Sequence, residues 1–488
     1  MSNQQPTLAK TAAIRSVTPL SGRPLGSPDD PRAVRPREKA AFTLGDIASN
    51  LTWTTISSYL LFFYTDVALI SAAIAGTVML VARLLDAVFD PIVGVLLDRT
   101  NTRWGRARPY LLFGAPVLAA LTMLTFLTPG GGDDTWTIVY AAVTFLLVGL
   151  AYSAVNVPYG ALMAMTTRDS GMRMKLAGWR GFGIGIGIII VSTAFQPLVA
   201  AIGGAPDSKF GFGVTAALFA FVGLVLFLLV FLWVKERVPL TPARLERGSL
   251  GASVRALFRN GPWLAVVSFS TLAFARLGVI TGGTIYYAIY VLHNPAAISI
   301  VLLAFSLSAV LGSLVTAPIL RVLGQRRGIL LGLVASVPLT LALIFLQDNL
   351  IAFTIVFFVA NVVGGFGFVA APALTADTVE WHEFRSTRRD EGLLFSGYSM
   401  STKVGAALGS AFLAWGLAAI AYDPANVTDT TSNGIMWLYI LLPVGITLLQ
   451  IIAISTYRLE KRLPEVQAEM NRRRAAAEGT ESEPGSTD

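Results

Sequence analysis

Residues 72–108 read AAIAGTVMLVARLLDAVFDPIVGVLLDRTNTRWGRAR. Its first part, 72–97, is a mostly apolar run, and a helix that spans a membrane needs only about 20 such residues. Arg83, Asp86 and Asp90 nevertheless lie inside the run, and a basic loop follows it. Charges inside an apolar span persist where they are paired or face a wet cavity. The stretch therefore predicts one helix of a membrane-embedded bundle.

The composition extends this prediction to most of the chain. The 488 residues are 54% hydrophobic and only 14% charged, with a mean hydropathy of +0.65, whereas a soluble globular protein carries roughly 25% charged residues. We therefore predict an all-α integral membrane protein with twelve transmembrane helices. Their expected limits are 44–65, 72–97, 109–128, 135–162, 177–202, 211–234, 260–291, 296–320, 327–346, 349–376, 394–421 and 434–457.

Basic residues are concentrated at every second boundary between these spans. The opposite loops are almost free of them, with Lys209 as the exception. Because cytoplasmic loops of membrane proteins carry the excess of Lys and Arg, both termini are expected in the cytoplasm, which requires an even number of spans. We expect a multi-pass protein of the inner or plasma membrane.

A weak repeat divides the spans into two halves of six. The basic, glycine-containing loop 98–106 has a counterpart in 321–328, and 157–162 has one in 371–374. Such halves are typical of transporters that alternate access around a site near the membrane midplane. The predicted organisation is a disordered cytoplasmic N-tail (1–40), a first six-helix half (41–235), a central cytoplasmic loop (236–259), a second half (260–457) and a cytoplasmic C-tail (458–488).

Other features argue against several classes of function. The chain has no cysteine and only two histidines, His293 and His382, so no metal centre is expected. The net charge of +8 is explained by cytoplasmic Lys and Arg that set topology, and no nucleic-acid partner is predicted. The absence of a nucleophile–base pair and of a sizeable polar loop argues against an enzyme, and no cofactor is expected.

The three charges of the second span point to a coupling site. Arg83, Asp86 and Asp90 are spaced by three and four residues, which places them on one helix face. Two carboxylates one turn apart repel each other unless a proton or a cation lies between them. Oxygen ligands whose charge is completed by the transported ion suit a proton or sodium site. The alternative is an internal ion pair between Arg83 and Asp86 that only locks helices together.

Polar residues in other spans extend the candidate site. Arg180 and Lys403 could bind hydroxyls or carboxylates of a solute, or pair with the carboxylates of the second span. For Arg276 we favour a structural role. Asn50 and Asn156 offer amide donors and acceptors that fit sugar hydroxyls, although interhelical hydrogen bonding is the common role of such residues in membranes.

Six short motifs are distributed along the chain. They are FYTD (63–66), RxxDxxxDP (83–91), RWGRxRP (103–109), ADTVEW (376–381), RxEG (389–392) and KxG (403–405). In order and spacing, over about 45–457, they resemble the glycoside–pentoside–hexuronide:cation symporters. This family is a branch of the major facilitator superfamily that includes the melibiose permease. The resemblance implies a fold of two pseudo-symmetric six-helix halves.

The resemblance also implies roles for individual positions. Asp86 and Asp90 match the carboxylates of the cation site, Ser153 matches a hydroxyl ligand, and Arg83 and Lys403 complete a charge network. The positions that match the sugar site are Asn50, Tyr152, Asn156, Arg180 and Phe368.

Some positions depart from the melibiose permease. Asn50 and Asn156 replace two sugar-site aspartates, so the cavity is expected to be more positive, because Arg180 and Lys403 are kept. Such a cavity suits an anionic glycoside such as a glucuronide, a pentoside, or simply a different neutral glycoside. Phe89 replaces an asparagine beside the cation carboxylates, which disfavours sodium and favours the proton as coupling ion.

The loop after the second span is interpreted as a cytoplasmic gate. Its charged residues would pair with acids at helix ends when that side is closed, and the alternative is that they are only topology charges. The gate residues are Asp98, Arg103, Arg106, Arg108, Asp377 and Glu380.

The expected function is secondary active transport in which H⁺ or Na⁺ drives symport of a sugar-like solute across the bilayer by a functional monomer. One alternative keeps the fold but carries a lysophospholipid or another amphiphile. A channel or a receptor is a more remote alternative.

Overall fold

The computed structural model describes residues 34–167, 169–238, 258–386, 391–466, 468–470 and 472, and its regular structure there is helical. Most of the predicted N-tail, central loop and C-tail lies outside the described residues. The first half contains α1 (Pro36–Phe62), continued by the π-helical turn η1 (Phe63–Val67), α2 (Ala72–Arg99), α3 (Arg108–Thr125), α4 (Thr135–Thr166), α5 (Ser170–Gly203) and α6 (Lys209–Trp233). The second half contains α8 (Gly261–Tyr286), continued by η2 (Tyr287–Val291), α9 (Ala296–Leu323), α10 (Gln325–Ala342) with η3 (Leu343–Phe345), α11 (Leu350–Gly364), α12 (Phe366–Ser386), α13 (Glu391–Ala419) and α14 (Asp429–Ser455), before the short η4 (Leu459–Lys461).

Ten helical segments of the described chain are long and apolar enough to cross a membrane. One of them, Leu350–Ser386, joins α11 and α12 across a break at Gly365. The helices α1 and α2, with 27 and 28 residues, are comparably long but are not among these ten segments. An all-α membrane protein is confirmed, and the predicted count of twelve depends on these two helices.

Several helices extend beyond the predicted spans. The first starts at Pro36 rather than 44, α5 starts at Ser170 rather than 177, and α12 continues to Ser386 rather than 376. Hydropathy marks only the part of a helix that matches the hydrocarbon layer, whereas backbone hydrogen bonding continues into polar sequence. The candidate gate acids Asp377 and Glu380 therefore lie within a helix.

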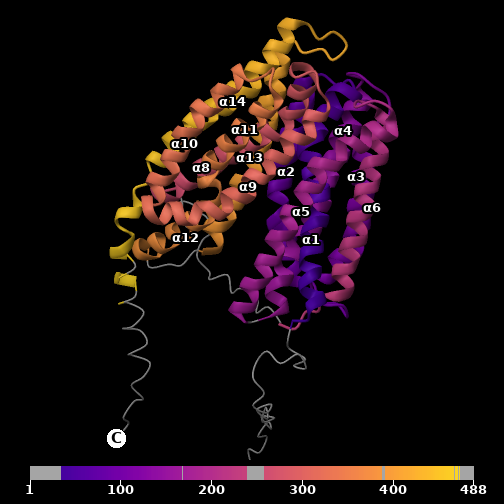
Figure 1. Cartoon of the computed structure of the whole chain (residues 1–488). Coiled ribbons are helices and arrows are strands. Elements are labelled where there is room, and N and C mark those ends of the chain that lie inside the picture. Colours follow the sequence, from indigo (N-terminus) through magenta and orange to yellow (C-terminus); the bar gives the residue numbers. More distant parts are fainter. Residues whose placement is uncertain are drawn as a thin grey trace, which may run out of the picture.

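The helices form two bundles, α1–α6 and α8–α14, which lie side by side (Figure 1). Within the first bundle α1 packs against α5 and α6, and α3 packs against α4 and α6. The two bundles meet along α2 and α13, α5 and α9, and α1 and α8. In Figure 1 their ribbons are close in the upper part of the view and diverge toward the lower end.

Cross-bundle hydrogen bonds connect the ends of α1 and α8. The Thr65 and Tyr286 hydroxyls lie 2.7 Å apart. The Asp66 carboxylate accepts hydrogen bonds from the hydroxyls of Tyr290 at 2.5 Å and Tyr422 at 2.6 Å. These contacts lie at the opposite end of the bundles from the start of α1. They hold the two bundles together there.

The opposite end carries two equivalent carboxylate caps. Glu236, after α6, accepts hydrogen bonds of 2.8–3.1 Å from the backbone N–H groups of residues 106–108. Glu460, in η4, accepts bonds of 2.6 and 3.0 Å from the N–H groups of Gln325 and Arg326. A carboxylate satisfies the free N–H groups of a helix start. A carboxylate that accepts such bonds thus follows the last helix of each half, in agreement with the predicted repeat.

Small residues let α8 and α13 approach closely. A Cβ atom built on Gly409 would overlap the carbonyl oxygen of Ala275, and one on Gly405 would overlap that of Thr271. Close approach through small residues four apart is how many membrane helices associate.

We expect Gly409→Ala to lower the melting temperature in detergent, because overpacking costs about 1–3 kcal/mol. Gly94→Ala is the matched control, since a Cβ there meets nothing within 4 Å and alanine favours a helix by about 1 kcal/mol. Equal melting temperatures for the two variants would show that the α8–α13 contact is not tight.

Candidate functional site

The carboxylates of α2 meet a lysine from the other bundle. Lys403 Nζ, on α13, lies 2.6 Å from Asp90 Oδ2 and 3.1 Å from Asp86 Oδ2. The Ser153 hydroxyl, on α4, donates to Asp86 Oδ1 at 2.7 Å and accepts from Lys403 Nζ at 3.1 Å. The structure thus brings together all three residues predicted to bind the cation, and the lysine ammonium occupies the place between their oxygens.

Asp86 and Asp90 differ in their surroundings. The Asp86 side chain is only 2% exposed and both of its oxygens have partners, whereas the Asp90 side chain is 24% exposed. Asp90 Oδ1 is buried and has no hydrogen-bond partner among the described residues. The cluster therefore retains an unused anionic oxygen beside the ammonium.

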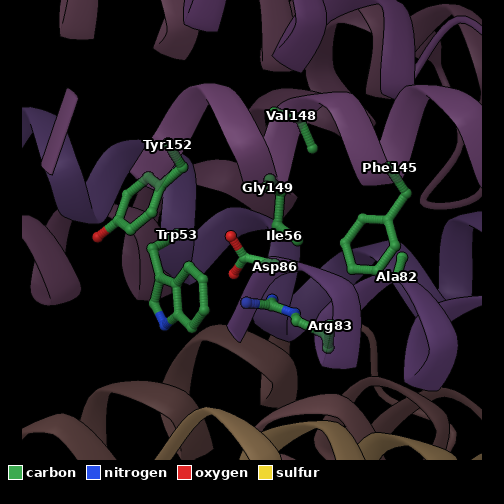
Figure 2. Close-up of a pocket in the computed structure, with 9 residues that line it drawn as sticks. All are labelled: Trp53, Ile56, Ala82, Arg83, Asp86, Phe145, Val148, Gly149 and Tyr152. Carbon is green, nitrogen blue, oxygen red and sulfur yellow. The ribbon is translucent and has the colours of Figure 1, made fainter. Parts of the chain in front are cut away.

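Arg83 contacts aromatic rings rather than Asp86, the partner that sequence spacing suggested. Its guanidinium lies over the Trp53 ring, 3.8 Å from the centroid, and 5.4 Å from that of Phe145. Figure 2 shows Arg83 and Asp86 in one small pocket with these two rings and Tyr152. The alternative of an Arg83–Asp86 lock is wrong for this conformation, because Lys403 and Ser153 hold the Asp86 carboxylate. Stacking on aromatic faces stabilises the arginine cation instead.

A second polar cluster joins α1, α4 and α5. Arg180 donates to Asp46 through Nε at 2.8 Å and through Nη2 at 3.0 Å. The Tyr159 hydroxyl donates to Asp46 Oδ2 at 2.7 Å. Asn50 Nδ2 donates to the Asp46 carbonyl at 2.9 Å. Three helices thus converge on one carboxylate.

Asn156 and Tyr152 lie beside this cluster. The Ser49 hydroxyl donates to Asn156 Oδ1 at 3.2 Å, and the rings of Tyr152 and Trp53 have centroids 5.1 Å apart. Four of the residues predicted for the sugar site therefore lie on helices α1, α4 and α5 of the first bundle: Asn50, Tyr152, Asn156 and Arg180.

Phe368 is placed elsewhere. It lies on α12 in the second bundle, 40% exposed, with its ring 4.9 Å from that of Phe274. Arg276, also in the second bundle, is buried and donates to Asn361 at 3.0 Å. This is the structural role favoured for Arg276, an interhelical hydrogen bond between α8 and α11.

Two of the candidate gate arginines contact their own half in this conformation. Arg108 donates to the Phe231 carbonyl at 2.7 and 3.1 Å, and Arg103 stacks on Trp104 at 4.2 Å from the ring centroid. Asp98 lies exposed in the last turn of α2, and Arg106 uses its backbone N–H for Glu236. Asp377 and Glu380 lie on α12 of the second bundle. Pairing of Arg108 with these acids requires another conformation and remains a prediction.

Asp46 is the functional candidate that sequence reasoning missed. It lies inside the predicted span 44–65, and a carboxylate in an apolar span is itself a signal of function. Its partnership with Arg180 corrects the expected excess of positive charge. Arg180 is neutralised by Asp46, and Lys403 by Asp86 and Asp90.

Two helical bundles around internal charges define a membrane transporter of the major facilitator fold rather than an enzyme. The chain belongs to the MFS/sugar transport protein family, whose model matches residues 41–461, and the resemblance to the glycoside–pentoside–hexuronide:cation symporters is confirmed.

Individual relatives cover nearly the whole chain. The isoprimeverose transporter of Lactiplantibacillus pentosus is 33% identical over 90% of this chain and 92% of its own length. The putative glycoside/cation symporter YagG of Escherichia coli K12 is 34% identical over 90% and 96%. The solved structure of the nucleoside transporter NupG matches with a TM-score of 0.63 at 15% identity over 86% of this chain and 99% of its own, which shows the common fold.

Proposed function

We propose that this protein is a proton-coupled symporter of a neutral glycoside. The observation that carries the proposal is the Lys403–Asp86–Asp90–Ser153 cluster, which joins the two bundles by charge. The names of the relatives, a glycoside/cation symporter and an isoprimeverose transporter, support the solute class.

The proton is proposed as coupling ion because the oxygens of the cluster already hold an ammonium. Protonation of Asp90 or Asp86 would remove one of the negative charges that bind Lys403, and so weaken the bond between α2 and α13. Sodium would have to displace Lys403 and collect several oxygen ligands, while the neighbouring Phe89 offers none. Coupling by linkage then requires that the solute raises proton affinity as much as the proton raises solute affinity.

A neutral solute is supported by the charge balance of the site. The cations are Arg83, Arg180 and Lys403, and the anions are Asp46, Asp86 and Asp90, so three positive and three negative charges cancel. The site therefore has no net positive charge that would favour an anionic glycoside such as a glucuronide. Asn50, Asn156 and the outer edge of Arg180 supply the donors and acceptors for hydroxyl groups.

We also propose the membrane, the orientation and the oligomeric state in which the protein works. The protein lies in the inner or plasma membrane with both termini in the cytoplasm, and it works as a monomer. Asp66 and its tyrosines then lie on the extracellular side, and this conformation is the one closed to the outside.

The function is tested by transport in proteoliposomes. We expect isoprimeverose to accumulate when a proton gradient is imposed, with or without sodium, and a protonophore to abolish the accumulation. Counterflow of labelled against unlabelled isoprimeverose distinguishes a carrier from a channel. Accumulation that requires a sodium gradient would overturn the choice of ion. Thermal stabilisation by lysolipids but by no glycoside would overturn the choice of solute.

A further inference from the structure

Asp46 is a buried carboxylate that lies outside the proposed cation cluster. It is 3% exposed, on α1, and it accepts two hydrogen bonds from Arg180 of α5 in a bidentate arrangement. A bidentate pair holds the planar guanidinium and the carboxylate in a fixed relative orientation. The pair therefore fixes the plane of the Arg180 guanidinium as well as its position.

A tyrosine confines the pair from a second side. Tyr159, fully buried on α4, donates to Asp46 at 2.7 Å, and Arg180 Cζ lies 4.8 Å from its ring centroid. Gly45 makes room for this ring, because a Cβ at that position would lie 2.6 Å from Tyr159 Cζ and 2.8 Å from its hydroxyl oxygen. The glycine that precedes Asp46 is thus part of the same arrangement.

Arg180 keeps N–H donors that Asp46 does not occupy. A guanidinium has five N–H donors, and Asp46 receives two of them. The Arg180 side chain remains 23% exposed, whereas that of Asp46 is 5% exposed. One face of the arginine is therefore held by protein and the other remains accessible to a solute. Asn50, which lies one turn beyond Asp46, is anchored to the Asp46 carbonyl.

We infer that Asp46 is a positioning residue of the solute site: it orients Arg180 for hydroxyl groups of the glycoside and cancels its charge. The inference rests on the proposed function and adds the residue that holds Arg180 in its solute-binding orientation. A donor held in its bound geometry before the solute arrives loses less freedom on binding. Without Asp46 the guanidinium would rotate, and its charge would be unbalanced beside a neutral solute.

The test is a double-mutant cycle of Asp46→Asn and Arg180→Gln, read by isoprimeverose counterflow. We expect Asp46→Asn to raise the half-saturating concentration on the order of 10-fold to 100-fold, as when a supporting residue misplaces a binding group. In the Arg180→Gln background, Asp46→Asn should raise it no further, because Asp46 acts through Arg180. The double variant also leaves no unpaired buried charge, so its folding is a control for the single variants.

Three further measurements test whether Asp46 acts by orienting Arg180. Gly45→Ala, which keeps both charges but displaces Tyr159, should raise the half-saturating concentration by a smaller factor. Asp134→Asn is the matched control, since Asp134 is an exposed cap of α4, and it should behave as wild type. The proton dependence of transport should persist in Asp46→Asn, because Asp86 and Asp90 are intact.

The outcomes separate this inference from the proposed function. An unchanged half-saturating concentration in Asp46→Asn, or an effect that adds fully to that of Arg180→Gln, overturns the inference while the function stands. A loss confined to the amount of folded protein shows that Asp46 is only structural and overturns it as well. No counterflow of isoprimeverose by the wild-type protein overturns the proposed function, and the inference falls with it.

Discussion

Asp86→Asn is expected to abolish concentrative uptake while counterflow continues. A membrane potential of 100 mV contributes about 2.3 kcal/mol per elementary charge, and a factor of ten corresponds to about 1.4 kcal/mol. One proton per neutral solute therefore supports about 50-fold accumulation by the wild-type protein at that potential. Asparagine cannot exchange a proton, and in this variant Asp90 is the one carboxylate of the cluster left to pair with Lys403, so the solute ratio should fall to about 1.

The geometry explains why exchange should survive this substitution. Asp90 Oδ2 lies 2.6 Å from Lys403 Nζ and continues to hold it, and the cluster around Arg180 is untouched. The measurement compares accumulation under an imposed potential with counterflow at zero potential, in the same proteoliposomes. Asp134→Asn serves as the control. If Asp86→Asn accumulated solute as the wild-type protein does, Asp86 would not be a coupling carboxylate.

The Lys403 ammonium reaches Asp86 and Asp90 from the opposite bundle. Sequence spacing shows that Asp86 and Asp90 share a helix face, since both lie on one helix. It cannot show that a lysine 317 positions away reaches between them. That contact depends on how α2 and α13 pack, which is a tertiary property. The resemblance to a family placed Lys403 near the cation site, and the structure adds the distances.

The fold was largely predictable because hydropathy and the distribution of basic residues are local signals. The polar ends of α5 and α12 were missed because helices continue beyond the apolar layer. The Arg83–Asp86 pair was plausible from spacing, but Trp53 offers its ring face to Arg83 from another helix. Asp46 was visible as an intramembrane acid, yet its importance comes from Arg180, 134 positions away.

Asp66 is the last residue of the FYTD motif (63–66). In the structure its carboxylate is the acceptor shared by Thr65 of its own bundle and by Tyr290 and Tyr422 of the other. Hydrogen bonds to a charged group contribute about 1.5–3 kcal/mol each. Two such bonds across the bundles therefore bias the equilibrium toward the conformation in which this end is closed, by roughly a factor of 100 or more.

We accordingly expect Asp66→Ala to populate a conformation in which this end is open. The chain contains no cysteine, so a spin-label pair can be introduced by Thr135→Cys and Thr430→Cys, at exposed starts of α4 and α14. Double electron–electron resonance should give mainly one short distance with Asp66 present and a longer, more populated distance in Asp66→Ala. Asp66→Asn, which keeps one acceptor oxygen, should lie between them.

The control and the contrary result are both defined by the structure. Asp348 is an exposed acid in the turn between α10 and α11, at the same end of the second bundle, so Asp348→Ala should leave the distance distribution unchanged. If Asp66→Ala gave the same distribution as Asp348→Ala, the tyrosine contacts would contribute only to packing and would not hold this end closed. If Asp66→Ala opened this end, it should also slow counterflow, because the carrier must close there before it can release solute to the cytoplasm. The combination of a longer distance and slower exchange would show that Asp66 stabilises one of the two states between which the bundles alternate.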